Sequence, residues 1–243
     1  MKRIKYKYFY NKQPFSIECV LPQYNDKKFV TFFNPYSAEI AKCYLNIYTR
    51  ADYICSDGFL PILLNILCKK NKSCRISFDM TSLAPIVFNQ LSKDNKSIFF
   101  VGTSPENIHA FVNIIKKEYP QLEISGYSDG YLDNEDKKMK VIETIINKNP
   151  STILVGMGTP LQDMFACDLL DCGYRGNIYT CGGFFHQTVN SINYYPRYID
   201  YLNLRWLYCI YKEKYILKRI LSYYPKFIFN YLYYLIFTDK SHK

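Results

Sequence analysis

Apolar and polar residues follow two different periods along the chain. Short apolar runs followed by turn residues predict buried strands at 29–33, 52–55, 97–102, 122–127, 152–158 and 178–183. Between these runs, apolar positions at helical spacing predict helices at 37–50, 104–120, 134–149 and 160–173. A strand that alternates with a helix is typical of a parallel sheet. We therefore predict an α/β fold: a Rossmann-like, mostly parallel sheet with helices on both faces.

The helix predicted at 104–120 carries the clearest start and stop signals. Ser104 is suited to cap its first turn, and Pro105 fits the first helical position. Glu106 favours the positive end of the helix, and Pro120 stops it.

Glycines gather where the predicted strands end, which is the edge where ligands bind in parallel α/β sheets. A glycine there lets backbone N–H groups approach an anionic ligand closely. Ordinary turns explain any single one of them equally well, but their shared position favours a rim-bound anion. They are Gly58, Gly102, Gly126, Gly156, Gly158, Gly182 and Gly183. The helix that opens at Pro160 would add a phosphate site at its N-terminus, although neither GxGxxG nor GxxxxGK[ST] is present.

The 243 residues carry a net charge of +10, which indicates acidic partners such as nucleic acid, an anionic membrane or phosphate-bearing substrates. Nine cysteines without a CxxC pair, and only three histidines, do not predict a zinc site. Reduced, core-filling cysteines of a cytosolic protein are the simpler interpretation. We expect neither a signal peptide nor a membrane span, because no continuous apolar segment is long enough.

The character of the chain changes near residue 196, where nine basic residues face three acidic ones up to residue 243. Arg205, Lys212, Arg219 and Lys226 recur every seven residues, so on a helix they form one basic stripe opposite Trp206, Ile210, Leu217 and Leu221. An aromatic segment follows Pro225. We predict an α/β domain at 1–195 and a helical, membrane-associating appendage at 196–243, with packing of this helix on its own domain as the alternative.

Six motifs, in this order, resemble the bacterial glycosyltransferases of the WecG/TagA/CpsF type. They are Asn34-Pro35, ADxxxxDG at 51–58, Arg75 to Met80, FFVGTSPENIHAF with YPQLEISGYSDGYL, ILVGMGTPLQD, and CGGFF followed by YYPRY and NLRWLY. The resemblance covers roughly residues 30–220. Each motif is weak alone, but the set is specific in this order and structural context.

This resemblance implies an inverting, metal-independent transfer of an N-acetylmannosamine-type or related hexose. The donor would be a UDP-sugar, and the acceptor a sugar on undecaprenyl diphosphate. The product would belong to a capsule, a teichoic acid or another surface polysaccharide. It places the enzyme in the cytoplasm, peripherally on the inner face of the plasma membrane, with no cofactor and no nucleic-acid partner. It leaves homo-oligomerisation open.

The resemblance also assigns roles to residues. Asp57 would be the general base that deprotonates the acceptor hydroxyl, whereas an Asp-Gly turn is its structural alternative. Arg75 would stabilise the leaving diphosphate. The implied substrate-binding residues are Asn34, Gly58, Asp79, Gly102, Gly126, Gly156, Gly158, Gln162, Asp163, Gly182 and Gly183. The tail would contact membrane or phosphate through Arg205, Lys212, Lys214, Lys218 and Arg219.

The sequence departs from the family pattern at several positions. Phe32 replaces a frequent threonine, the usual glycine near Ser77 is missing, and Asp163 replaces a glutamate. Arg205 stands where the family has glutamate, and Cys209 where it commonly has arginine. These changes put the identity of the donor sugar in doubt. They also keep an inactive homologue, or a non-catalytic nucleotide-binding module at a membrane, as alternatives. Nucleic-acid binding by the tail is disfavoured by its high apolar content.

Overall fold

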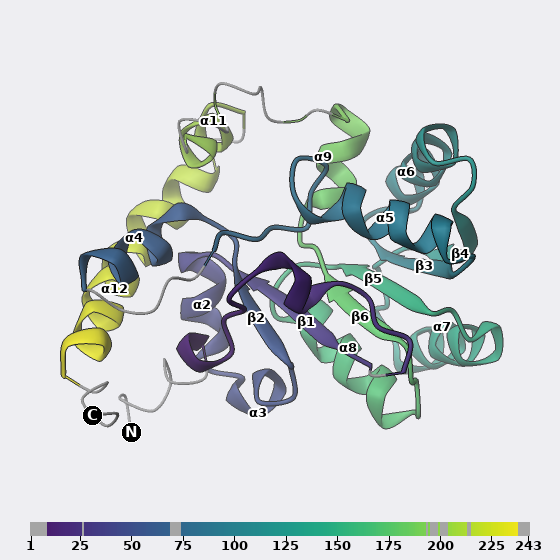
Figure 1. The fold of residues 1–243 in the computed structure, drawn as a ribbon, viewed down its shortest axis with the longest axis horizontal. Helices are drawn as coiled ribbons and strands as arrows, with labels where there is room; N and C mark the ends of the chain where they lie inside the picture. The colour runs from purple at the N-terminus through teal and green to yellow at the C-terminus, as the bar shows by residue number, and fades with distance from the viewer. Residues whose placement is uncertain are drawn as a thin grey trace.

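The protein is built on one six-stranded parallel sheet (Figure 1). The computed structural model describes residues 9–25, 27–68, 74–192, 194, 199, 204–212 and 215–237. The strand order is β2-β1-β6-β5-β3-β4, so the chain crosses between non-adjacent strands through helices. The strands are β1 (Phe29–Phe33), β2 (Tyr53–Ser56), β3 (Ser97–Gly102), β4 (Glu123–Ser128), β5 (Thr152–Gly156) and β6 (Asn177–Thr180).

Helices cover both faces of the sheet, which confirms the predicted α/β fold. One face is covered by α2 (Pro35–Ala41), α3 (Leu45–Tyr48), α7 (Glu135–Lys148) and α8 (Leu161–Asp171). The other face is covered by η1 (Ile17–Val20), α5 (Leu83–Lys93), α6 (Pro105–Glu118) and α9 (Phe184–Asn190). Beyond strand β2 lie α4 (Phe59–Leu67), α11 (Arg205–Lys212) and α12 (Tyr215–Phe237).

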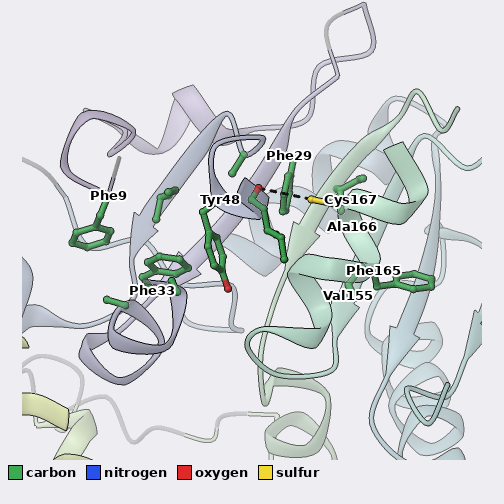
Figure 2. Close-up of a cluster of buried hydrophobic side chains, with 14 of the residues drawn as sticks. Phe9, Phe29, Phe33, Tyr48, Val155, Phe165, Ala166 and Cys167 are labelled. Carbon is green, nitrogen blue, oxygen red and sulfur yellow. Dashed lines mark hydrogen bonds between the residues drawn. The ribbon is translucent and has the colours of Figure 1, made fainter. Parts of the chain in front are cut away.

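Two apolar clusters hold the layers together, because alternate strand residues point to opposite faces. On β3, Phe99 and Val101 join the first cluster, and Ile98 and Phe100 join the second. Figure 2 shows part of the first cluster, in which Phe29 and Val155 lie against side chains of the surrounding helices. A hydrogen bond from Cys167 Sγ to the Ile47 carbonyl (3.8 Å) joins α8 to α3 there.

The predicted elements match the observed ones except in three places. The helix expected at 37–50 is two helices, since hydrogen bonds from Cys43 and Tyr44 to carbonyls three residues earlier close α2. Helices η1, α4, α5 and α9 were not predicted. Gly126 lies inside β4 rather than at a strand end. The Ser104 cap is confirmed, because its Oγ accepts a hydrogen bond from the Asn107 N–H (3.3 Å).

The predicted C-terminal helical segment is present as α12, and the second half of this helix is part of the core. Phe227, Tyr231, Tyr234 and Leu235 are buried in the first cluster, together with Phe9. α12 packs against α2 and α4, as Figure 1 shows along the edge of the molecule beyond β2. The alternative from the sequence, packing on its own domain, therefore holds for this half. None of the helices that the structure describes combines the length and apolar character needed to cross a membrane.

Gly102 and Gly156 occupy paired positions where β3 and β5 end. A Cβ on Gly102 would lie 2.3 Å from the Gly156 carbonyl oxygen, and its φ of +149° disfavours any side chain. Gly158 also has a positive φ, of +76°, but a Cβ there would meet nothing within 4 Å. Gly102→Ala should therefore lower the free energy of unfolding by about 2–3 kcal/mol, and Gly158→Ala by about 1 kcal/mol. Urea unfolding tests this, and equal costs would contradict the packing argument.

Candidate active site

The carboxyl ends of all six strands lie on one edge of the sheet, and the connections diverge there. The chain leaves β3 for α6 on one face and leaves the neighbouring β5 for α8 on the other. Such a divergence opens a crevice, which is where ligands bind in parallel α/β sheets. The N-termini of α6 and α8 both begin at this edge, so their free N–H groups favour an anion.

The glycines that the sequence places at this edge separate into two groups. Gly102, Gly126 and Gly156 are small because of protein packing: a Cβ on any of them would lie within 2.7 Å of a neighbouring atom. Gly58, Gly158 and Gly182 have positive φ values and open space beside them, and a Cβ on Gly183 would make only an ordinary contact. The open positions are the ones that a bound phosphate could approach closely.

Gln162 connects two of the loops around the crevice. Its side chain is buried, and Oε1 accepts a hydrogen bond from the Gly182 N–H (3.0 Å), so the loop after β6 is tied to the start of α8. The preceding Thr159–Pro160 peptide bond is cis. Gln162 thus supports the shape of the predicted nucleotide cradle from inside the protein.

Asp57 directly follows β2, and its N–H donates to the Phe33 carbonyl (2.8 Å). Gly58 then starts α4. The residue as a whole is half-buried at the carboxyl edge of the sheet. Burial raises the pKa of Asp57 to about 6, and the negative charge of Asp79 adds to this effect. The guanidinium groups of Arg205 and Arg75 oppose it. At neutral pH this carboxylate is mostly ionised and has a pKa close to the one that suits a general base.

Arg75 lies next to Asp57, because its backbone forms a parallel bridge with Ser56. Its charge reaches the Asp57 carboxylate, as the effect on the pKa indicates. The structure thus brings together the predicted base and the predicted diphosphate-binding cation, although the chain separates them by the whole of α4. The bridge fixes where the backbone of Arg75 lies at this edge.

Asp79 and Asn34 both have structural partners. Asp79 accepts hydrogen bonds from Ser77 Oγ (2.6 Å), the Thr81 N–H (2.8 Å) and Thr81 Oγ1 (2.7 Å). Burial tends to raise the pKa of Asp79, but Arg205 and these hydrogen bonds outweigh it and lower the pKa. Asn34 caps α2, since its Oδ1 accepts from the Ser37 N–H (3.0 Å) and the Asn34 N–H donates to Ser37 Oγ (2.9 Å).

Asp163 lies in the interior, and its assignment as a substrate-binding residue stays a prediction. Its side chain is fully buried and accepts hydrogen bonds from Thr31 Oγ1 (2.6 Å) and Tyr48 OH (3.0 Å). Thr180 Oγ1 in turn donates to Thr31 Oγ1 (2.9 Å), so the network joins α8, β1, β6 and α3. Burial raises the pKa of Asp163 to about 7, against these hydrogen bonds. The residue holds the layers together below the crevice.

Arg205 and Lys212 lie on α11 and Lys218 and Arg219 lie on α12, and residues 213 and 214 between them are outside the part of the chain that the structure describes. Arg205 is turned inward to Asp79, at 2.6 Å, and its contact with membrane or phosphate stays a prediction. Arg219 lies over the ring of Tyr36 (4.5 Å to the centroid), and Lys218 is exposed. Lys214 and the side chain of Lys212 lie outside the part of the chain that the structure describes, as does the predicted domain boundary at 195–196.

Two features of the site were not predicted from the sequence. Tyr224 of α12 lies near Asp57, since burial and then the Asp57 and Cys209 charges raise its pKa. Ten of the 25 tyrosines lie beyond residue 195, so nothing in the sequence distinguished this one. Thr103, just after β3, has a φ of +55°, and its carbonyl accepts from the Gly130 N–H (2.9 Å). Among the described residues, no group of three or more His, Cys, Asp or Glu is arranged to hold a metal ion.

Comparison with known proteins agrees with this arrangement. The sequence profile of the Glycosyl transferase WecG/TagA/CpsF family matches residues 16–241. The chain belongs to this family. It is therefore a glycosyltransferase, which confirms the resemblance seen in the motifs.

Curated relatives of this glycosyltransferase carry specific activities in their names. A Shigella boydii protein is 37% identical over 84% of this chain and 85% of its own length. Its name is UDP-Gal:alpha-D-GlcNAc-diphosphoundecaprenol beta-1,4-galactosyltransferase. A Bacillus subtilis protein is 27% identical over 85% of this chain and 81% of its own length. It is named N-acetylglucosaminyldiphosphoundecaprenol N-acetyl-beta-D-mannosaminyltransferase.

Among solved structures, an extracellular ligand-binding receptor from Rhodopseudomonas palustris matches at 14% identity, with a TM-score of 0.35. The match covers 64% of this glycosyltransferase and 60% of the receptor. A likeness at this level carries no argument about function.

Proposed function

We propose that this glycosyltransferase moves a hexose from a UDP-sugar to N-acetylglucosaminyl-diphosphoundecaprenol, with inversion at the sugar carbon. The observation that carries the proposal is Asp57 at the carboxyl edge of the sheet, with its pKa raised to about 6 and Arg75 beside it. A base near neutral pH and a cation for the leaving group are the two components that such a transfer needs.

In the proposed reaction, Asp57 takes the proton of the acceptor hydroxyl as its oxygen attacks the anomeric carbon. The bond between that carbon and the diphosphate oxygen breaks, and the electron pair leaves with UDP. Arg75 stabilises the charge that develops on the diphosphate, together with the N–H group at the open glycine Gly158. Attack on the side opposite the leaving group inverts the anomeric configuration.

The acceptor and donor are proposed from the named activities of the relatives. Both names specify an N-acetylglucosaminyl group on diphosphoundecaprenol as acceptor, whereas one transfers galactose and the other N-acetylmannosamine. Incubating the protein with a short-chain lipid-diphosphate-GlcNAc and single UDP-hexoses, with products weighed by mass spectrometry, tests the proposal. One UDP-hexose should add a single hexose mass, with UDP-galactose expected first. Failure with every donor, alongside an active relative as control, would overturn it.

Metal independence is a separate part of the proposal, and it rests on the family resemblance and on the guanidinium group beside Asp57. We expect the transfer rate to stay within about twofold when EDTA is added, and to stay there when Mg²⁺ or Mn²⁺ is restored. Initial rates with and without chelator measure this. A loss of rate that Mg²⁺ restores would show that a metal assists the leaving group.

We also propose that α12 brings the enzyme to an anionic bilayer, where its lipid-linked acceptor lies. The first half of the helix carries the exposed Leu217 and Leu221 next to the cations Lys218 and Arg219. Vesicles that contain anionic lipid should carry the protein upward in a flotation gradient. Leu221→Asp should reduce the floated fraction, and neutral vesicles should carry less. Equal flotation with both lipid types would contradict the electrostatic part.

A further inference from the structure

Arg205, at the start of α11, reaches back to the segment after Arg75. Its Nη1 donates to Asp79 Oδ2 (2.6 Å) and to Ser77 Oγ (3.2 Å), and its Nη2 donates to Thr81 Oγ1. Both side chains of the Arg205–Asp79 pair are only 12% exposed. A planar guanidinium that donates to three oxygens and is largely buried is held in one orientation.

The same pair lies within electrostatic reach of Asp57. Besides Asp79, four titratable side chains from different segments interact electrostatically with Asp57: Cys55 on β2, Arg75 after α4, Arg205 on α11 and Tyr224 on α12. Asp79 favours the protonated form of Asp57, and Arg205 favours the ionised form. An unpaired carboxylate at position 79 would therefore oppose the ionisation that a general base needs.

We propose that Arg205 is a positioning residue for the transfer reaction, which anchors α11 over the 77–81 segment and neutralises Asp79 next to Asp57. The inference rests on the proposed role of Asp57 as the base. It uses a residue at which this chain departs from its family pattern, since arginine stands here in place of glutamate. Cys209, one helical turn later on the same face of α11, takes the place of the common arginine.

The pH dependence of kcat/KM tests the inference. If Arg205 and Asp79 had only a structural role, replacing each in turn would not shift the acid limb of the profile in opposite directions. In Arg205→Gln, the acid limb should move upward by about one pH unit, since Asp79 is left unpaired. In Asp79→Asn, the amide keeps the oxygen that Thr81 binds, and the limb should move downward. The double variant should return close to the native profile. Limbs that stay at the native pH in both single variants would overturn the inference.

A direct measurement separates this inference from the proposed function. The ionisation of Asp57 can be followed by ¹³C NMR of protein labelled at the aspartate carboxyl carbons, with the resonance assigned by its loss in Asp57→Asn. Without any substrate, the pKa of this resonance should shift upward in Arg205→Gln and downward in Asp79→Asn. If the resonance shifts as expected but Asp57→Asn remains fully active, the assignment of the base fails while the charge coupling stands. If Asp57→Asn is inactive but neither substitution moves the resonance, the inference alone fails.

Two further variants control for folding and for charge. Arg205→Lys keeps the cation but not the planar fork, so we expect a native acid limb with a lower kcat. Arg50 and Asp171 form a bidentate pair (2.7 and 2.8 Å), on the exposed surface beyond α3. Arg50→Gln should leave the Asp57 resonance in place. A shift as large as that of Arg205→Gln would show a general effect of net charge and overturn the inference.

Discussion

Replacing Asp57 by Asn is expected to lower the transfer rate by about 10²–10⁴-fold, because the amide cannot accept the proton of the acceptor hydroxyl. UDP binding, measured by calorimetry, should persist, since the substitution keeps the size of the side chain and leaves Arg75 in place. Asp94→Asn changes an exposed carboxylate that accepts a hydrogen bond from Tyr24 OH (2.8 Å), and it serves as the matched control. Native turnover by Asp57→Asn would overturn the proposed function.

The raised pKa also fixes how activity and stability depend on pH. Because Asp57 titrates near pH 6 in the folded enzyme, kcat/KM should fall as the pH drops through about 6. The free energy of unfolding responds in the opposite way: the contribution of Asp57 to it falls as the pH rises. The unfolded carboxyl ionises more readily, from about pH 3.8 upward, so Asp57 costs stability above that pH. Asp57→Asn should therefore raise the melting temperature at pH 7 and leave it unchanged below pH 3.8.

Replacing Phe227 by Ala is expected to lower the free energy of unfolding by about 3–5 kcal/mol, because the ring is fully buried in the first cluster. Its centroid lies 5.1 Å from that of Tyr231 and 6.3 Å from that of Phe9. Phe229, two residues later, is 73% exposed, so Phe229→Ala should cost little. Urea unfolding of the two variants compares these costs. Equal small effects would contradict the burial of α12 in the core.

The sheet could be predicted from the sequence because its strands are buried on both faces and so appear as uninterrupted apolar runs. The helix boundary inside 37–50 could not, since α2 and α3 bury residues on the same face of the sheet and apolar spacing continues across the break. Spacing reports burial and not the continuity of the helix. Hydrogen bonds from the N–H groups of Cys43 and Tyr44 to carbonyls three residues earlier end α2, and no residue pattern in the sequence predicts them.

The site was predicted in part. Asp57 and Arg75 came from the family motifs, and the structure brings them together. Asp163 belongs to the same matched motif, but it faces the interior, because on α8 the side that contacts Thr31 and Tyr48 is the side turned to the sheet. The pairing of Arg205 with Asp79 spans more than a hundred residues. The spacing of charges along the tail had instead predicted that Arg205 lies on an outward-facing basic stripe. Contacts between distant segments leave no local pattern to read.

The buried half of α12 has a consequence for how the protein is made. Phe9 is covered by Phe227 and Tyr231, and Tyr231 OH donates to Asn65 on α4 (2.8 Å). This end of the core therefore closes only after the segment around residue 231 has left the ribosome. Until then the apolar surface around Phe9 and Phe33 stays open to solvent on the nascent chain. Chaperone binding during synthesis should accordingly concentrate on chains stalled before that segment emerges.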